Sequence, residues 1–589
     1  MICGLASVRR ARPSVGPKTI VCALQAQLNR VGFRTRVRFL GSLKVLLLAF
    51  RFWEIWFLRD FRRIFFGRSR AILLGAAFVC FGFGQAHALC NASSVLVYGG
   101  TPGGIMAAIQ AATMKKKVTL LEPTAHVGGM MSNGLTKTDA SPRTNVYGGL
   151  VAAFLRQARN HYRSVDPVRI YFESHWAEQT FKTGLSRAGV DVRYGQRIIT
   201  VTRSGRQIKR VRMTTGEEYC ADIFIDASYE GDLMARSGVS TIIGRESSSK
   251  YGETAAGVQR INYPTVGPND IEIKVDPYVK QGDPRSGLLP GVIDTGQLAI
   301  GSADKSLMAF NYRFCITRTG QKVPFTKPQN YDPLRYETTA RFLRAAQNAG
   351  VKISASHFTG GGVTVNGQQD VNSTPYFSTN VWHIGYSYVV GNEARRNAIR
   401  NMVRDHILGL MWFATTDPRV PTHVREFTAQ YGLCANEFTD NGNFPRQIYV
   451  RQARRLLGQL VLTQNDLQNK TRFPDSIGLG YYPMDEHGMI RTVKAGYIAD
   501  ESRESISVGP YQIPYRAMLP KQTQVTNLIV PIALSTSHAA YTSVRVEPTY
   551  MVLGQAAGAA AALATNGDAS GVNIVKLRKT LAAAGQIME

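Results

Sequence analysis

The stretch from Ser94 to Leu135 constrains the fold more than any other part of the chain. A short run of β-branched and apolar residues, Val95–Tyr98, predicts a buried strand that runs directly into glycines. An alanine-rich helix is expected at Ile105–Met114, and a second buried strand at Val118–Leu121. Strand, glycine turn, helix and strand in this order predict the βαβ unit of a dinucleotide-binding domain.

The glycine turn consists of Gly99, Gly100, Thr101, Gly103 and Gly104. Glycines at such a turn let backbone N–H groups approach a pyrophosphate at the positive end of the helix. The turn departs from the GxGxxG pattern because Thr101 stands where the middle glycine belongs, and an ordinary strand–turn–helix is the alternative. Glu122 closes the second strand at about the spacing, 20 residues, at which a carboxylate binds the ribose. The position of Glu122 therefore favours a dinucleotide-binding turn over an ordinary strand–turn–helix.

The strongly basic composition is concentrated at the N-terminus. The formal net charge is +29, and residues 1–70 contain fifteen Lys or Arg against two acids, which is a net +13. The remaining +16 is spread without a long basic run or an aromatic-basic repeat. Because no recognition motif accompanies this charge, we expect no nucleic-acid partner.

Residues 62–88 have the organisation of an export signal. A basic segment that includes Arg62 and Arg63 precedes the apolar run Ala71–Gly84, and Ala86-His87-Ala88 is an A-x-A cleavage site. The arginine pair resembles a twin-arginine signal, which exports folded proteins. We therefore expect export to the periplasm, with cleavage near Ala88. The apolar run is too short for a spanning helix, so no stable membrane span is expected in the mature chain, and a retained anchor is the alternative.

Four cysteines follow the predicted cleavage site, Cys90, Cys220, Cys315 and Cys434. No CxxC occurs, so the sequence indicates neither a zinc site nor a dithiol redox pair, and no metal is expected. In an oxidising compartment one or two disulfides can form, with the pairing open, and buried free thiols are the alternative.

The chain after the βαβ unit continues with helices at Val151–Tyr162 and Tyr171–Ala188 and a hairpin of Val192–Thr202 with Ile208–Met213. A further strand, Tyr219–Asp226, ends in the turn DASYEGDL. Near the C-terminus a strand is expected at Asn527–Pro531, followed by a helix of small residues that starts near Pro548. Such a helix packs closely against a sheet or a cofactor, and its positive end suits a reduced flavin. A purely structural helix is the alternative.

Six motifs together resemble a family of FAD-dependent oxidoreductases with the glutathione-reductase-type FAD fold, from about Ser94 to the C-terminus. The motifs are GGTPGGIMAA, EPTAHVGGMMSNGL, DASYEGDL, NYRFCIT, PYQIPYRAMLPK and TSHAAYTSVRVEPTYMVLGQAAG. A threonine in the glycine turn is common in this family. The resemblance implies that FAD is the cofactor.

The resemblance also implies which residues hold each part of FAD. The ADP half would be held by Gly99, Gly100, Gly104 and Glu122. The pyrophosphate and ribityl chain would lie along Gly128, Gly129 and Met130, and the adenosine side would be closed by Asp226 and Gly231. The flavin end would be approached by Glu547, Gly554, Gln555 and Gly558.

The expected fold is α/β, with an FAD-binding domain built from two segments, 92–243 and 511–589, after an N-terminal extension, 1–88. Residues 244–510 would form an inserted α+β substrate or cap domain. In this insert we expect a strand at Asn311–Arg318 and helices at the following ranges: Arg335–Ala349, Val389–Thr415 and Gln447–Leu457.

The candidate catalytic residues are His538, His487, Arg545 and Arg516. A neutral histidine could accept the proton that accompanies hydride transfer, and an arginine could bind a substrate carboxylate or an anionic reduced flavin. His538 is ranked first because it is close in sequence to the predicted flavin helix; a structural histidine is the alternative. Arg545 could instead pair with Glu547 or with FAD itself. His126 is a candidate for covalent flavin attachment, with a surface turn histidine as the alternative.

Two classes of function follow. The first is an exported FAD-dependent enzyme that acts on a small organic molecule, such as a sugar or hydroxy acid, by hydride transfer. The second is a flavin-binding electron carrier without small-molecule turnover; the large insert favours the enzyme. A second glycine fingerprint for a nicotinamide is absent from the sequence. Oxygen, a quinone and a periplasmic cytochrome are all compatible electron acceptors.

Overall fold

The computed structural model describes residues 90–138, 146–164, 170–266, 270–372, 377–503 and 505–589. The predicted export signal at 62–88 and its cleavage site lie outside the described residues. Among the helices that the structure does describe, none combines the length and the apolar composition needed to cross a membrane.

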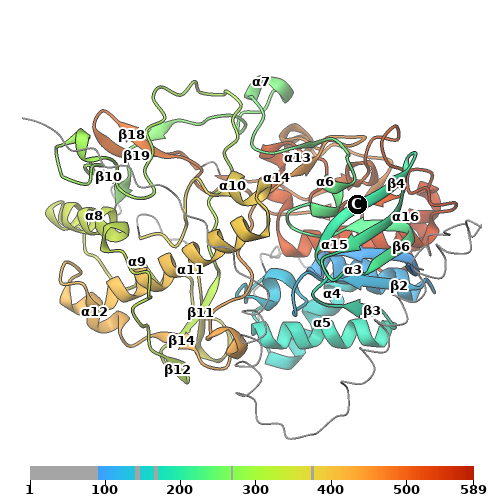
Figure 1. Cartoon of the computed structure of the whole chain (residues 1–589), viewed down its shortest axis with the longest axis horizontal. Coiled ribbons are helices and arrows are strands. Elements are labelled where there is room, and N and C mark those ends of the chain that lie inside the picture. Colours follow the sequence, from blue (N-terminus) through green and yellow to red (C-terminus); the bar gives the residue numbers. More distant parts are fainter. Residues whose placement is uncertain (1–89, 139–145, 165–169, 267–269, 373–376, 504) are drawn as a thin grey trace, which may run out of the picture. The chain divides into compact units, whose positions relative to one another are not determined.

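The main sheet has seven strands in the order β3-β2-β1-β6-β5-β4, with β22 paired to β6 (Figure 1). Their bounds are β1 (Asn91–Tyr98), β2 (Val118–Leu121), β3 (Asp191–Arg193), β4 (Ile198–Ser204), β5 (Gln207–Met213), β6 (Glu218–Asp226) and β22 (Leu528–Ile529). The pairs β1–β2, β2–β3, β1–β6 and β6–β22 are parallel, and β5 pairs antiparallel with both β4 and β6. The parallel βαβ unit and the mixed α/β class are confirmed.

The predicted bounds of the first strand of the hairpin are wrong. The expected strand Val192–Thr202 is divided into β3 and β4, because Gly195 adopts a positive φ of 70° between them. β3 joins β2, and only β4 forms the hairpin with β5.

The helices are α3 (Pro102–Thr113), α4 (Gly149–Tyr162), α5 (Ser174–Ala188), α6 (Asp232–Arg236), α7 (Ser248–Tyr251), α8 (Glu337–Asn348), α9 (Ser356–Thr359), α10 (Gly385–Val390), α11 (Glu393–Thr416), α12 (Thr422–Thr428), α13 (Gln464–Asn469), α14 (His538–Val544), α15 (Glu547–Leu563) and α16 (Ile574–Ala583). α3 and α15 pack closely against each other (Figure 1). A Cβ atom on Gly554 would collide with the carbonyl oxygen of Gly103, and one on Gly558 with that of Ala107. The small residues of the C-terminal helix therefore allow two backbones to meet.

The remaining strands form smaller sheets. They are β7 (Thr241–Ile242), β8 (Ile261–Asn262), β9 (Thr265–Val266), β10 (Ile271–Glu272), β11 (Phe314–Thr317), β12 (Lys322–Val323), β13 (Gln368–Val371), β14 (Gly432–Cys434), β15 (Arg455–Leu456), β16 (Ser476–Gly480), β17 (Met484–Asp485), β18 (Arg491–Lys494), β19 (Tyr497–Glu501), β20 (Ser505–Ile506) and β21 (Tyr511–Pro514). The largest of these sheets has the order β12-β14-β11-β13 and is antiparallel.

Two helices expected in the insert differ from the structure. The range Val389–Thr415 contains the end of α10 and most of α11, which are separated at Gly391 because Asn392 caps the second helix through its side chain. The helix expected at Gln447–Leu457 is wrong, since this segment is extended and includes β15. Its backbone bonds to distant segments, for example from Tyr449 N to the carbonyl of Asn311. Tertiary contacts override the local helix propensity there.

Both pairs of cysteines in the described residues form disulfides. Cys90, the residue before β1, joins Cys220 in the neighbouring parallel strand β6, and Cys315 joins Cys434 between the antiparallel strands β11 and β14. The pairing that the sequence left open is decided by which strands are neighbours in the sheets.

We expect the paired substitution Cys315→Ala and Cys434→Ala to lower the free energy of unfolding by about 2–4 kcal/mol. The reason is that the bond closes a long loop, with a sequence separation of 119, in the unfolded chain. Thermal unfolding of the variant beside the native protein measures this. Equal midpoints for the two proteins would show that the bond does not form.

Candidate functional site

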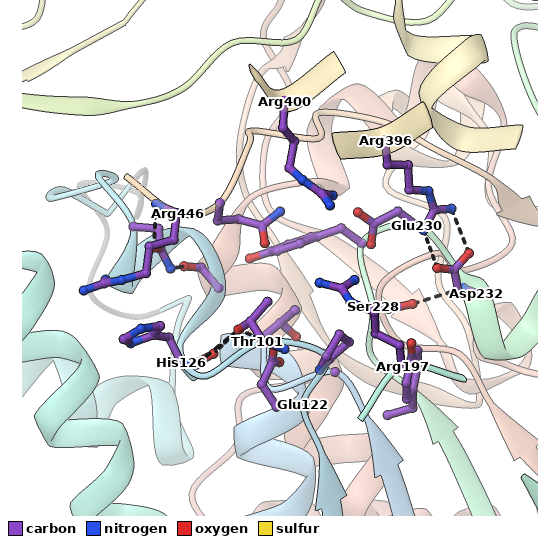
Figure 2. Close-up of a pocket in the computed structure, with 18 of the residues that line it drawn as sticks. Thr101, Glu122, His126, Arg197, Ser228, Glu230, Asp232, Arg396, Arg400 and Arg446 are labelled. Atoms are coloured by element: carbon purple, nitrogen blue, oxygen red, sulfur yellow. Dashed lines mark hydrogen bonds and ion pairs between the residues drawn. The ribbon is translucent and has the colours of Figure 1, made fainter. Parts of the chain in front are cut away.

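A cavity of about 230 Å³ lies where β1 and β2 end, next to the start of α3 (Figure 2). Its wall includes Gly99, Thr101, Glu122 and Gly129 from the N-terminal part of the chain. The glycine turn and the predicted ribose-binding carboxylate therefore face the same cavity.

The glycine turn is shaped by short-range contacts. Gly99 has a φ of 103°, and a Cβ on Gly104 would overlap the carbonyl oxygen of Gly99. Thr101 caps α3: its hydroxyl accepts a hydrogen bond from Gly104 N at 3.2 Å and donates to the carbonyl of Ala227 at 2.8 Å. Threonine in place of the middle glycine thus ties the helix start to the end of β6.

Glu122 is buried at the cavity wall and organises both neighbouring turns. Its carboxylate accepts from Gly100 N at 2.8 Å and from the backbone N and the hydroxyl of Thr124 at 2.7 Å. Burial raises the pKa of Glu122 above the ordinary glutamate value, although these hydrogen bonds oppose the shift.

The second glycine turn connects the cavity to the start of α15. Gly128 and Gly129 both have positive φ, and Met130 N donates to the hydroxyl of Tyr229 at 3.0 Å. That hydroxyl donates to Glu547 Oε1 at 2.5 Å. Met130 and Glu547, far apart in sequence, are thereby joined through Tyr229.

Asp226 and Gly231 shape the turn after β6 but do not line this cavity. The fully buried Asp226 carboxylate accepts from Ser228 N and Met234 N, and desolvation raises its pKa to about 6. Gly231 has a left-handed conformation before α6. Ser228, Tyr229 and Glu230, between these two residues, reach the cavity instead.

Arginines from the insert complete the cavity, and the sequence reasoning did not identify them. Figure 2 shows Arg400 directed toward the cavity, with Arg446 near His126 and Arg396 beside Asp232. Arg396 pairs with Asp232 at 2.5 Å, and Arg400 donates to the hydroxyl of Tyr388 at 3.1 Å. The spacing of four residues between Arg396 and Arg400 places both side chains on one face of a helix. This spacing is the feature of the sequence from which the two cavity arginines could have been predicted.

Gly554, Gln555 and Gly558 have structural contacts in α15. The two glycines meet α3, and Gln555 Oε1 accepts from Leu150 N at 2.8 Å near the start of α4. Their approach to a flavin stays a prediction.

The structure brings His487 and Arg545 together at a third residue, Asp485. The Nε2 atom of His487 lies 3.3 Å from Asp485 Oδ2, and Arg545 Nη2 lies 3.1 Å from the same oxygen. Nδ1 of His487 has no hydrogen-bond partner within the described part of the chain. Desolvation, followed by the positive charge of Arg451, holds the pKa of His487 well below its usual value. The ring is therefore neutral at pH 7, and a proton on Nε2 leaves Nδ1 as an acceptor.

His538 belongs to a different buried network. Its Nδ1 lies 2.9 Å from the side-chain amide of Gln452, and its Nε2 lies 3.0 Å from Glu486 Oε1. Desolvation and the charge of Arg455 lower its pKa to about 3. Because both ring nitrogens are engaged, the geometry favours His487 over His538 as a proton acceptor.

Two other candidates lie apart from these networks. Arg516 forms an ion pair with Asp475 at 2.9 Å, and its side chain is 45% exposed. His126 lines the cavity with its ring between Glu178 and Asp440, at 3.0 Å from each.

A cluster of Glu173, His175 and Glu437 has the composition of a metal site, with its ligand atoms within 4.8 Å of one another. The Glu173 carboxylate already accepts from the amides of Gln368 and Asn366, each at 2.9 Å. Both oxygens of the Glu173 carboxylate are therefore already engaged in hydrogen bonds to side-chain amides.

Comparison with known proteins gives the family. Residues 94–581 match the family described as FAD dependent oxidoreductase, and no curated protein matches the chain. Solved structures with partial similarity include a myxobacterial FAD-dependent chondrochloren halogenase, at 22% identity over 26% of this chain and 41% of that one, TM-score 0.19. They also include p-nitrophenol 4-monooxygenase from Pseudomonas putida, at 12% identity over 27% and 45% of the two chains, TM-score 0.21.

A third is L-proline dehydrogenase from P. horikoshii, at 13% identity over 32% of this chain and 65% of that one, TM-score 0.23. The chain thus spans less than two thirds of each of these three proteins. The family match, in contrast, extends over most of the chain, and it contains the glycine turn, Glu122, His487 and Arg545. The protein therefore belongs to the family of FAD-dependent oxidoreductases and is a flavin-dependent enzyme.

Proposed function

We propose that this enzyme is exported and transfers a hydride between a small organic substrate and FAD, with His487 as the acceptor of the accompanying proton. The observation that carries the proposal is the pairing of the buried His487 with the half-buried Asp485, which leaves Nδ1 of a neutral ring without a partner in the described chain. A structural histidine usually has its ring nitrogens satisfied when it is buried.

The residues around the cavity fit the ADP half of FAD. A side chain on Gly104 would fill the turn, and the start of α3 offers backbone N–H groups and a positive dipole for phosphate. Glu122 would hold a ribose hydroxyl, and Arg400 would face the negative charge of the pyrophosphate. Gly129 and Met130 would continue the site toward Glu547 at the start of α15.

FAD supplies the hydride acceptor or donor when it is bound. Asp485 fixes the His487 ring by accepting from Nε2–H, so that Nδ1 can take a proton. Arg545 holds Asp485 from the other side and donates to the hydroxyl of Tyr449 at 3.0 Å. Its charge favours a negatively charged group next to this cluster.

The proposed arrangement is an FAD-binding domain made of residues 92–243 and 511–589, with residues 244–510 as a substrate domain. In support, β22 pairs with β6, and α15 packs on α3. The insert contributes arginines to the cavity and His487 to the proton-accepting pair. The large insert supports an enzyme over an electron carrier.

Export to the periplasm through the twin-arginine route is part of the proposal. The two disulfides support it, because disulfides form and persist in oxidising compartments. N-terminal sequencing of the exported protein should give a start near Leu89. A periplasmic protein that retains residues 62–88 would contradict the cleavage.

The test of hydride transfer is anaerobic mixing of the purified yellow protein with small hydroxy acids and sugars. We expect at least one of them to bleach the flavin absorbance. An electron carrier would be bleached by dithionite but by none of the small molecules, and bleaching by NADPH would identify a nicotinamide-dependent reductase. FAD should be released by acid precipitation; colour that stays in the pellet would mean a covalent link, with His126 the first position to map.

A further inference from the structure

A second cavity, of about 70 Å³, lies in the insert and shares no lining residue with the first. Six of the residues that line it matter here: Arg335, Thr338, Asn380, Trp382, His406 and Arg491. Arg335 comes from the 3-10 turn Pro333–Tyr336, and the others come from the start of α8, from α11, from β18 and from the loop before α10. Its volume suits a group of a few heavy atoms rather than a nucleotide.

The electrostatic character of this cavity is positive. Two arginines and no carboxylate line it. Arg491 is neutralised by a bidentate pair with Asp500 at 2.7 and 2.8 Å. The guanidinium of Arg335, in contrast, has no ion pair or hydrogen bond with any residue that the structure describes. An unpaired guanidinium at a cavity favours a carboxylate, because it can donate two parallel hydrogen bonds to it.

Two buried polar atoms at this cavity also lack partners among the described residues. They are the hydroxyl of Thr338, whose residue is 5% exposed, and Nδ2 of Asn380, whose residue is 2% exposed. Leaving such atoms without hydrogen bonds costs free energy that a polar ligand would recover. Oδ1 of Asn380 is already held by Arg451 at 3.0 Å, so the amide orientation is fixed with Nδ2 as the donor.

The other side of the cavity offers an acceptor. His406 Nε2 lies 3.0 Å from the carbonyl oxygen of Ser378, which requires the proton on Nε2 and leaves Nδ1 as a hydrogen-bond acceptor. Desolvation, with the charges of Arg335 and Arg491, lowers the pKa of His406 to about 4, so the ring is neutral at pH 7. Trp382 forms an apolar wall, and the Arg491 guanidinium lies 4.8 Å from its ring centroid.

We propose that this cavity binds a small 2-hydroxy carboxylate. Arg335, the Thr338 hydroxyl and the Asn380 amide would donate to the carboxylate, and Nδ1 of His406 would accept from the hydroxyl. As a ligand site it does not depend on the proposed function. A chain of contacts connects it to the cluster of Asp485, His487 and Arg545: Asn380 bonds to Arg451, which lies 4.8 Å from the ring centroid of Tyr449, the partner of Arg545.

The test is isothermal titration of the FAD-loaded protein with glycolate, acetate and propane-1,2-diol at constant ionic strength. Glycolate carries both groups, acetate lacks the hydroxyl, and the diol lacks the carboxylate. We expect glycolate to bind most tightly, acetate more weakly and the diol not at all. Absence of glycolate binding, or equal affinities for glycolate and acetate, would overturn the proposal.

Variants then locate the site. Arg335→Gln should weaken glycolate binding about tenfold or more, whereas Arg344→Gln, at an exposed position on the following helix α8, should leave it unchanged. Thr338→Val should weaken binding and also raise the melting temperature of the ligand-free protein, because it removes a buried hydroxyl without a partner. Equal glycolate affinities for the two arginine variants would place the ligand elsewhere.

A bound 2-hydroxy carboxylate could be a substrate that reduces the flavin or a ligand that does not react. Anaerobic addition of glycolate distinguishes these two roles. Bleaching of the flavin identifies the cavity as part of the substrate site. Binding without bleaching identifies a ligand that does not react, and it leaves both the cavity assignment and the proposed hydride transfer standing, since other substrates test the latter.

Discussion

Gly104→Ala should abolish FAD binding. The added Cβ would overlap the carbonyl oxygen of Gly99 and lie 2.9 Å from the Cβ of Ala227. The Gly99 oxygen is a backbone atom and Ala227 is buried, so neither atom can move freely. The clash would therefore displace the start of α3 from β1 and β6. The helix end that would face the pyrophosphate is then lost. The flavin absorbance of the purified variant, and its recovery on addition of FAD, measure the effect.

Gly320→Ala is the matched control, because the nearest atom to its added Cβ, the hydroxyl of Thr317, would be 3.4 Å away. This variant should retain FAD and unfold at the temperature of the native protein. If Gly104→Ala retained a stoichiometric amount of FAD, the placement of the cofactor at the glycine turn would be wrong.

His487→Gln should lower the rate constant of flavin reduction by substrate about 10²–10⁴-fold while FAD stays bound. Glutamine can keep the hydrogen bond to Asp485, but it cannot accept a proton at neutral pH. Stopped-flow measurement of flavin bleaching gives the rate constant, and the absorbance before mixing gives the FAD content. His161→Gln, at an exposed position on α4, is the control and should react at the native rate.

The pH dependence of the same rate constant tests the protonation state of His487. Its pKa is held well below 6.5 by burial and by the charge of Arg451, so the folded protein keeps this ring neutral as the pH falls through 6.5. The rate constant should therefore stay level between pH 8 and about pH 6 and fall only in more acidic solution. A loss centred at pH 6.5 would mean that an unperturbed histidine accepts the proton.

Local patterns predicted the parts of the fold that depend on neighbouring residues. The strands at Val95–Tyr98 and Val118–Leu121, the helix between them and the C-terminal helix near Pro548 are all present. The helix expected at Gln447–Leu457 is absent, because that segment is held extended by distant partners such as Asn311. Helical periodicity in a buried segment does not distinguish these outcomes.

The candidate site also has a part that the sequence predicted and a part that it did not. The sequence placed Gly99, Thr101 and Glu122 correctly at one cavity, since their spacing along a βαβ unit fixes their positions. It ranked His538 above His487 by distance along the chain. In the structure, alternate residues of the segment 484–487 face two different networks: Asp485 holds His487, and Glu486 holds His538.

The sequence by itself determined the family, the cofactor and the glycine turn between β1 and α3, because these depend on short motifs whose geometry is local. Tertiary structure decided which cysteines pair, which histidine keeps a nitrogen available, and which arginines of the insert reach the first cavity. These properties depend on burial and on contacts between residues that lie on different strands and helices, such as Cys90 with Cys220 and His538 with Gln452. No local pattern encodes such contacts, since they arise only when the sheets and helices pack.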